Sequence, residues 1–391
     1  MENYYADLHI HVGISADGQW IKIPASRQLT VKNICNHAAK QKGLHLIGLV
    51  DALSPLVLHD LRQLYNEGLL VPLSGGGYQY DHRLTLLLGA EIETREIQGG
   101  MCHTLIFLPD ITTMQSFAEY MKMFIANIHL STQNARMPLS QLVKIAADFE
   151  AIIIPAHIFT PYKSIYGSSA RRFSQLLTDK LMAKISAVEL GLSADSSMAD
   201  RIGELASFTF LTNSDAHSPA KIGREYNLVT LQQPSFQEFL LALEGREGRG
   251  VTGNYGLDPR LGKYHRTCCE MCGHTMPDGL NDNCVHCGSR HIVKGVFERI
   301  GEIADYDEPV HPCKRPFYHY QIPLEFIPGI GQQTLGKLVR QFDTEMNVLH
   351  KVHFDDLQMA VGSKIASAIA AARTGEVMVL SGGGGRYGKI I

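Results

Sequence analysis

No hydrophobic stretch in the sequence approaches the roughly 18 consecutive apolar residues that a membrane-spanning helix needs. Residues 1–7 lack the basic region and apolar core of a secretory signal peptide. An excess of either charge is also missing, because the formal net charge of the 391 residues is only −3. The first two absences predict a cytoplasmic protein, and the third gives no sign of a nucleic-acid binder that relies on bulk electrostatics.

Disulfides are also expected to be absent, since a cytoplasmic setting keeps the 8 cysteines reduced. Half of them form two Cys-x-x-Cys-Gly knuckles, Cys269/Cys272 and Cys284/Cys287, separated by 11 residues. In such a knuckle the glycine permits a tight turn that points two thiolates at one ion. Four thiolates leave no open coordination position, so the pattern predicts a structural zinc ion and not a catalytic one.

The first 250 residues alternate between short apolar runs and helical stretches, which is typical of an α/β fold with a parallel sheet. A glycine-rich change of composition at residues 245–262 indicates a linker. A cysteine-rich segment and then a helical segment follow, and the glycine-rich residues 381–388 are expected to be disordered. We therefore divide the chain into residues 1–255, 256–320 and 321–391.

Acidic residues and histidines gather at the ends of the expected strands of the first part. They are Asp7, His9, His11, Glu91, His103, His157, Asp215 and His217. In the His9/His11 and Asp215/His217 pairs, the i, i+2 spacing places both side chains on one face of a strand. Because the carboxyl ends of parallel barrel strands meet at one mouth, these residues indicate a multinuclear metal site. Two or three divalent ions a few Å apart suit the cleavage of a phosphoester.

The order of these motifs resembles the polymerase-and-histidinol-phosphatase (PHP) domain, over roughly residues 1–255. The resemblance implies a distorted (β/α)7 barrel in which Glu91 bridges two metals. The implied ligands are His9, His11, Glu91 and Asp215 for the first metal, and Glu91, His103 and His157 for the second. The residues expected to serve catalysis are Asp215, Glu91, His157 and Asp7, of which Asp7 would orient a ligand rather than bind an ion.

A third metal is implied by the same resemblance, with Asp17 and His217 as its ligands. Here the sequence departs from the family, whose Thr-Asp-His motif stands as Val50-Asp51-Ala52. The usual third-site histidine is therefore missing, and Asp51, His37 or a water molecule would have to replace it. Imidazole-rich sites suit zinc, whereas carboxylates leave manganese or magnesium open for this centre.

A helix, a tight Pro-Gly-Ile-Gly turn and a second helix are predicted at residues 326–340. This segment resembles the helix-hairpin-helix motif, and a weaker second copy is expected at residues 354–373. The glycines of such a turn let backbone N–H groups approach a DNA phosphate. The candidate DNA-binding residues are Gly329, Gly331, Thr334 and Lys337, joined near the metal site by Lys163 and Arg224, with Tyr162, Ser164 and Lys221 as further pocket candidates.

The whole arrangement, over about residues 1–373, resembles the endonuclease Q family, which couples a PHP domain, a zinc-binding domain and a helical domain in this order. The resemblance implies cleavage of DNA on the 5′ side of deaminated bases (uracil, hypoxanthine or xanthine) and of abasic sites. Residues and spacing alone reach only a metal-dependent DNA phosphodiesterase, associated with DNA in the cytoplasm.

Three alternatives remain open at this level. The same metals could serve a 3′–5′ exonuclease without lesion preference, or a small-molecule phosphoesterase whose C-terminal part binds a partner. The absent histidine at position 52 would also suit a catalytically inactive DNA-binding scaffold. Cutting of an internal lesion, with the undamaged control intact, separates the first interpretation from all three.

Overall fold

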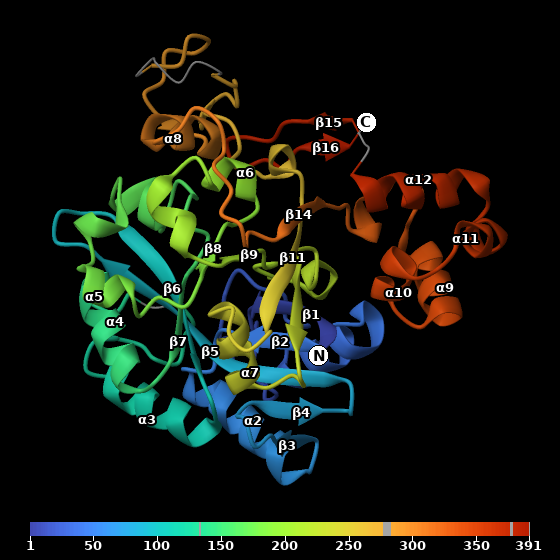
Figure 1. Ribbon diagram of the computed structural model, residues 1–391, viewed down its shortest axis with the longest axis horizontal. Helices are drawn as coiled ribbons and strands as arrows, with labels where there is room; N and C mark the ends of the chain where they lie inside the picture. The colour runs from blue at the N-terminus through green and yellow to red at the C-terminus, as the bar shows by residue number, and fades with distance from the viewer. Residues whose placement is uncertain (133, 277–282, 376–377, 391) are drawn as a thin grey trace.

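A mixed ten-stranded sheet forms the centre of the N-terminal part of the chain (Figure 1). The computed structural model describes residues 1–132, 134–276, 283–375 and 378–390. The strands follow the order β14-β11-β10-β1-β2-β5-β4-β3, and β6 and β7 continue from β5. With the short β8 and β9, the bounds are β1 (Glu2–Ile10), β2 (Leu46–Leu49), β3 (Leu70–Pro72), β4 (Tyr78–Tyr80), β5 (Leu84–Arg95), β6 (Met101–Leu108), β7 (Ile152–Pro155), β8 (Val188–Glu189), β9 (Phe210–Leu211), β10 (Tyr226–Leu231), β11 (Gly250–Gly256) and β14 (Phe317–Tyr320).

Seven strands close into a barrel, in the order β1, β2, β5, β6, β7, β8 and β9. The Ser186 N–H donates to the Ile153 carbonyl at 2.9 Å and so joins β7 to the start of β8. β8 pairs in parallel with β9, and the segment after β9 returns to β1, where the Ala216 N–H donates to the His9 carbonyl at 3.0 Å. The predicted α/β barrel is confirmed.

The barrel strands are not parallel throughout, which corrects the expected parallel sheet. β1, β2 and β5 are parallel, whereas β6 runs antiparallel to both β5 and β7. The connection between β5 and β6 is only residues 96–100, in which Gly99 and Gly100 have φ angles of 96° and 86°. So short a connection can join only antiparallel neighbours. Strands buried on both faces are apolar whatever their direction, so their composition could not reveal this.

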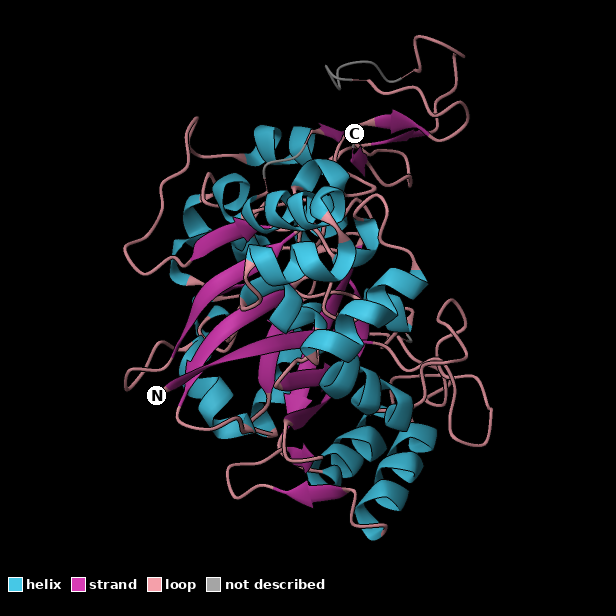
Figure 2. Cartoon of the chain, turned by 90° about the vertical axis from the view of Figure 1, so that its right-hand side faces the viewer, coloured by secondary structure: helices cyan, strands magenta, loops and turns pink. Residues whose placement is uncertain are grey.

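Helices pack around these strands (Figure 2). Each buries an apolar stripe, as in α4, where Leu139, Leu142, Val143 and Ala146 repeat at helical spacing. The π-helical turn that continues α1 ends at Gly43, whose φ of 81° lies in the left-handed region that glycine adopts without strain. Within the described residues, every helix is too short or too polar to cross a lipid bilayer. The bounds are α1 (Val31–Asn36), α2 (Pro55–Asn66), α3 (Ile111–Met121), α4 (Leu139–Asp148), α5 (Asp179–Met182), α6 (Ser196–Ala199) and α7 (Phe236–Leu243).

The cysteine-rich segment has almost no apolar core of its own. Its two-stranded sheet consists of β12 (Cys268–Cys269) and β13 (Ile292–Val293), and its buried cluster is Cys269, Met276 and Cys284. The following α8 (Val296–Ile303) instead buries its apolar face against the barrel core. So small a unit needs another source of stability, such as a bound ion.

Four helices form the C-terminal part, which lies beside the barrel (Figure 1). They are α9 (Gln332–Phe342), α10 (Glu345–His350), α11 (Phe354–Val361) and α12 (Ser363–Thr374), and they enclose an apolar cluster around Leu338, Leu357 and Ile369. An ion pair of 3.0 Å between Lys42 and Glu345 fastens α10 to the barrel. The second expected hairpin is present as α11 and α12, whereas the first helix expected before the glycine turn is only a 3-10 turn at Leu324–Phe326.

The glycine-rich tail is ordered in its described residues, which corrects the expected disorder. β15 (Val379–Leu380) and β16 (Lys389–Ile390) pair, and the loop between them lies against residues 260–268. The Gly382 N–H donates to the Arg260 carbonyl at 2.7 Å, and a Cβ on Gly382 would meet backbone oxygen at 2.5 Å. The glycines thus allow close packing of backbone on backbone, which composition alone does not distinguish from flexibility.

Candidate metal centre

Two triads of metal-ligand residues lie together at one mouth of the barrel. One comprises His9, His11 and Asp215, and the other comprises Glu91, His103 and His157; within each, the ligand atoms lie within 4.8 Å of one another. They come from β1, β5, β6 and the turns that follow β7 and β9. The structure thus brings together all the residues expected to bind the first two metals.

In the first triad, the imidazoles of His9 and His11 face the Asp215 carboxylate. The Nε2 atoms lie 3.6 and 3.5 Å from Asp215 Oδ1. Both Nε2 atoms are buried and have no hydrogen-bond partner among the described residues. Buried polar atoms without partners are rare because each costs free energy, so this arrangement fits a metal ion between the three side chains.

Glu91 faces both triads, as a bridging carboxylate must. Its Oε1 lies 2.6 Å from His103 Nδ1 and 3.4 Å from His157 Nε2. The same carboxylate lies 3.6 Å from His9 Nε2 and 3.5 Å from His11 Nε2. Burial raises the pKa of Glu91, but the His103 and Lys22 charges overcome this and hold it well below its usual range. Glu91 is therefore an ionised carboxylate available to two ions.

The imidazoles of His9 and His11 are oriented by carboxylates on their far side. His9 Nδ1 lies 3.0 Å from Glu189 Oε2, and His11 Nδ1 lies 3.1 Å from Asp51 Oδ2. Because a carboxylate accepts, each Nδ1 carries the proton and each Nε2 presents its lone pair to the triad. Asp51 thus lies behind His11 and does not face the triads as a ligand.

A chain of buried amides holds Glu189 in place. Asn254 donates to Asn227 at 3.0 Å, Asn227 donates to Asn213 at 3.1 Å, and Asn213 donates to Glu189 at 2.8 Å. All three side chains are buried. The chain reaches from β11 to His9, so the orientation of this imidazole is determined across four strands of the protein.

Glu189→Gln is expected to weaken metal binding by about 10–100-fold, the usual effect of removing a group behind a ligand. The substituted amide has one oxygen for His9 Nδ1–H and Asn213, so its NH2 group would face the His157 N–H, which Glu189 Oε1 accepts at 3.1 Å. Calorimetric titration of metal-free protein with Mn²⁺ measures the change, with the exposed Glu119→Gln as control. An unchanged affinity would mean that the triad orients itself without Glu189.

The expected third site is only partly assembled. His217 lies close, with its ring centroid 4.5 Å from that of His11 and its Nδ1 3.4 Å from Asp215 Oδ1. Burial, together with the charges of His11 and Lys22, lowers the pKa of His217 to about 4. Asp17 is exposed, and within the described part of the chain it belongs to neither triad. Ala52 has no side-chain ligand atom. His37 lies on the π-helical turn that follows α1, and it belongs to neither triad of the described residues, although its buried Nε2 has no hydrogen-bond partner.

Asp7 acts through the backbone of the turn that carries Asp215. Its carboxylate accepts from the Ser214 N–H at 3.0 Å and from the Gly223 N–H at 2.8 Å. Burial raises the pKa of Asp7 to about 6 against the effect of these hydrogen bonds. Asp7 thus contacts the turn that carries Asp215 and belongs to neither triad of the described residues, and its role in orienting that ligand stays a prediction.

Two of the candidate ligands have unusual backbone conformations. His157 and Asp215 have φ angles of 31° and 45°, in the left-handed region that non-glycine residues seldom occupy. Flanking hydrogen bonds hold both turns, since Ile158 N–H donates to Glu189 O and Ala216 N–H donates to His9 O, each at 3.0 Å. Strain of this kind persists where the surrounding structure enforces it, and it is concentrated at functional sites.

Several side chains of the centre have no signal in the sequence. Lys22 reaches Glu91 from a loop, and Thr132 donates to Glu91 Oε2 at 2.6 Å from another loop. Both belong to irregular segments without motif or periodicity. Glu189 could have been found, since it ends an apolar run as the other site residues do.

The four predicted zinc ligands also lie together. The Sγ atoms of Cys269 and Cys287 are 3.6 Å apart, as are those of Cys272 and Cys284. A tetrahedron with Zn–S bonds of about 2.3 Å has edges of about 3.8 Å, so the spacing fits zinc. Gly273 and Gly288, each with φ 72°, make the two turns that the knuckles require.

Three candidate DNA-binding side chains make internal contacts instead of facing solvent freely. Lys163 pairs with Glu93 at 2.8 Å, Lys337 donates to the Ala360 carbonyl at 2.6 Å, and the buried Arg224 donates to the Ser214 carbonyl at 2.7 Å. By contrast, Gly329 and Gly331 are exposed at the start of α9, and Thr334 is half-buried in its first turn. The glycine turn, with φ 94° at Gly329, thus leaves the backbone accessible.

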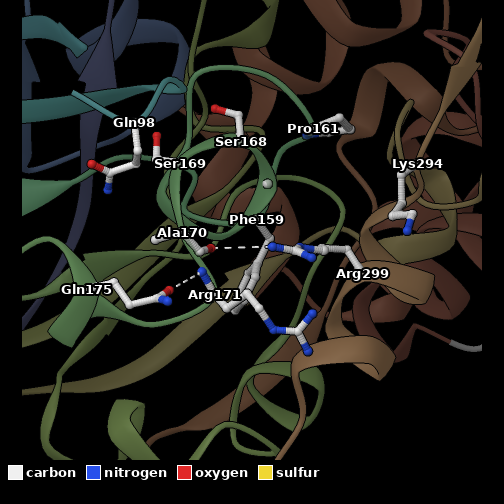
Figure 3. Close-up of a pocket in the computed structure, with 11 residues that line it drawn as sticks. Gln98, Phe159, Pro161, Ser168, Ser169, Ala170, Arg171, Gln175, Lys294 and Arg299 are labelled. Carbon is white, nitrogen blue, oxygen red and sulfur yellow. Dashed lines mark hydrogen bonds between the residues drawn. The ribbon is translucent and has the colours of Figure 1, made fainter. Parts of the chain in front are cut away.

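A cavity of about 420 Å³ lies between α8 and residues 159–171, the loop that follows His157 (Figure 3). Arg171, Lys294 and Arg299 line it, and Arg299 donates to the Ala170 carbonyl at 3.4 Å. Its Ser168 donates to the Met101 carbonyl at 2.7 Å, two residues along β6 from His103. This basic cavity therefore lies beside β6, the strand of His103, and two of its three cations, Lys294 and Arg299, are paired with Glu302.

Comparison with known proteins places this architecture among related chains. No family model matches the sequence. The chain is 44% identical to the uncharacterized Bacillus subtilis protein YqxK, and the match covers 100% of both.

Two solved structures extend the comparison to the fold. The lesion-specific endonuclease PfuEndoQ from Pyrococcus furiosus has a TM-score of 0.84 and 32% identity, covering 100% of this chain and 95% of that one. An Endonuclease Q bound to a 27-mer duplex with an abasic lesion at its active site has a TM-score of 0.85 and 33% identity. That match covers 100% of this chain and 96% of the other. These similarities span all three parts of the chain and confirm the predicted fold class.

Proposed function

The chain belongs to the endonuclease Q family, and from that premise we propose that it cuts DNA on the 5′ side of deaminated bases and abasic sites. Membership of the family makes it a hydrolase that acts on DNA, in repair. The proposal adds the choice of lesion, namely uracil, hypoxanthine, xanthine or an abasic site, and the position of the cut.

The observation that carries the proposal is the carboxylate of Glu91 between the two triads. Two divalent ions a few Å apart would activate water and stabilise the charge of the attacked phosphate. The residues that would hold them are His9, His11 and Asp215 on one side and His103 and His157 on the other, with Glu91 shared. Other side chains of the protein would orient these ligands. Glu189 lies behind the His9 imidazole, Asp51 lies behind the His11 imidazole, and Asp7 holds the turn that carries Asp215.

DNA as the substrate is supported by features outside the metal centre. The exposed Gly329–Gly331 turn can approach a phosphate with backbone N–H groups, and the basic cavity beside α8 can accept a further part of the strand. Recognition of a damaged base within a duplex needs access to its hydrogen-bonding edge, and turning the nucleotide out of the stack would provide that access. Tyr162 is half exposed on the loop that follows His157, and we expect its ring to contact such a base.

The test uses end-labelled duplexes that carry one deoxyuridine, one deoxyinosine, one abasic site or no lesion, incubated with Mg²⁺ or Mn²⁺. The expected result is one cut immediately 5′ of each lesion, with the undamaged duplex intact. A ladder that shortens from the 3′ end on all four duplexes would replace the proposal by a lesion-independent exonuclease. If the protein binds the duplexes but cuts none of them with either metal, the missing histidine at position 52 would favour a catalytically inactive DNA-binding scaffold.

A further inference from the structure

Lys22 brings an ammonium group into the metal centre from a loop with no regular structure. The loop is fixed by its backbone, because the Ile21 and Lys22 N–H groups donate to the Gly13 carbonyl at 2.9 and 3.2 Å. The Ser131 N–H donates in turn to the Ile21 carbonyl at 2.8 Å. The Lys22 side chain is only 12% exposed. Its position is thus built by the surrounding structure, unlike that of a surface lysine.

The partners of Lys22 are the shared carboxylate and one hydroxyl. Its Nζ lies 3.2 Å from Glu91 Oε2 and donates to Thr132 Oγ1 at 2.5 Å. Thr132 Oγ1 donates in turn to Glu91 Oε2. A buried ammonium requires such partners, since leaving it unpaired is costly. Lys22 therefore lies beside the carboxylate that faces both triads.

The balance of these contacts changes once ions are bound. Ions held by the two triads would compete with the Lys22 ammonium for the oxygens of Glu91, and Thr132 would remain its hydrogen-bond partner beside the charges of Asp51 and Asp215. An anion arriving from the open side of the centre can then satisfy Lys22. Of the third-site residues implied by resemblance, His217 lies beside His11, whereas Asp17 is exposed and belongs to neither triad, and position 52 is alanine.

We propose that Lys22 is a catalytic residue whose ammonium contacts a non-bridging oxygen of the scissile phosphate, as a third positive charge beside the two ion positions. This inference rests on the proposed function only in taking a phosphodiester as substrate; it does not depend on which lesion is chosen. A charged donor aimed at the phosphate stabilises the charge that develops in the transition state.

The experiment compares Lys22→Met and Lys22→Arg with wild type and with the exposed control Lys32→Met. Metal content is measured by mass spectrometry after loading with Mn²⁺, duplex affinity by fluorescence anisotropy, and cleavage under single-turnover conditions. Lys22→Met is expected to keep the wild-type metal content and duplex affinity while cutting about 100–1,000-fold more slowly. Lys22→Arg is expected to recover part of the rate.

A modified substrate distinguishes phosphate contact from a purely structural role. In a duplex whose scissile linkage is a methylphosphonate, one stereoisomer lacks the oxygen that Lys22 would contact. On that isomer, the ratio of the wild-type cleavage rate to the Lys22→Met rate is expected to fall below about three.

Three results would overturn the inference. Lys22→Met could lose its metal, it could cleave as fast as wild type, or its rate could be reduced by the same factor on both stereoisomers. The first would mean that Lys22 only positions Glu91. Cleavage of bis(p-nitrophenyl) phosphate by the same variants keeps the test valid if the lesion preference proves wrong, because that diester carries no base.

Discussion

Asp215→Ala is expected to abolish lesion cleavage while leaving duplex binding within about twofold of wild type. Asp215 supplies the carboxylate oxygen that faces both His9 and His11, so its loss removes the anionic member of the first triad. Removing a group that merely supports a ligand costs about 10–100-fold, and losing the ligand itself should exceed that range. The DNA contacts proposed for the glycine turn of the helical part do not involve this side chain.

Single-turnover cleavage and fluorescence anisotropy on the same duplex measure the two effects separately. The matched control is Asp148→Ala, which removes an exposed carboxylate at the end of α4. Substantial residual cutting by the Asp215 variant would contradict the assignment of the first triad as a metal site. Loss of duplex binding would instead mean that the turn after β9 contacts the DNA.

Cys284→Ala is expected to remove the zinc ion that the four-cysteine site is proposed to bind, and to unfold the cysteine-rich unit. The buried cluster of this unit is Cys269, Met276 and Cys284, too little apolar surface to hold a fold. Binding of a structural zinc contributes about 10–16 kcal/mol in small zinc-dependent units, so little other stabilisation would remain. Zinc content should fall by one ion per chain, and limited proteolysis should begin within residues 263–295.

Lesion cleavage should also fall by about tenfold or more in this variant, because the loop after His157 loses a support. Tyr162 on that loop donates a 2.7 Å hydrogen bond to Glu270, which follows Cys269. The control is Cys313→Ala, since Cys313 is an exposed free thiol outside the knuckles. If Cys284→Ala retained its zinc and its protease resistance, the four-cysteine assignment would have to be abandoned.

The sequence predicted those parts of the centre in which chemistry is encoded locally. His9 and His11 share a strand face through their spacing, and the two knuckles define their own turns. The expectation that Glu91 bridges two metals came instead from the order of motifs far apart in the chain, which resembles that of the PHP domain. Each of these predictions needed only the residue type and a short neighbourhood, or a known order of motifs.

What could not be predicted depends on contacts between distant segments. Lys22 and Thr132 meet at Glu91 only because two irregular loops pack together, and Lys337 is satisfied by the Ala360 carbonyl of a neighbouring helix. The expected parallel direction of β6 and the expected disorder of the glycine-rich tail were wrong for a related reason. Apolar composition is the same in parallel and antiparallel buried strands, and glycine serves both flexibility and close packing.

The buried amide chain from Asn254 to Glu189 also sets a time at which the metal centre can be completed during synthesis. His9 emerges from the ribosome among the first residues, whereas Asn254 lies in β11, close to the end of the barrel part. Chains emerge N-terminus first, at about 5–20 residues per second. His9 therefore waits on the order of ten seconds or more for the last group that fixes its imidazole. Full metal affinity is accordingly expected only after β11 has paired with β10, whereas the ligands of both triads are synthesised earlier.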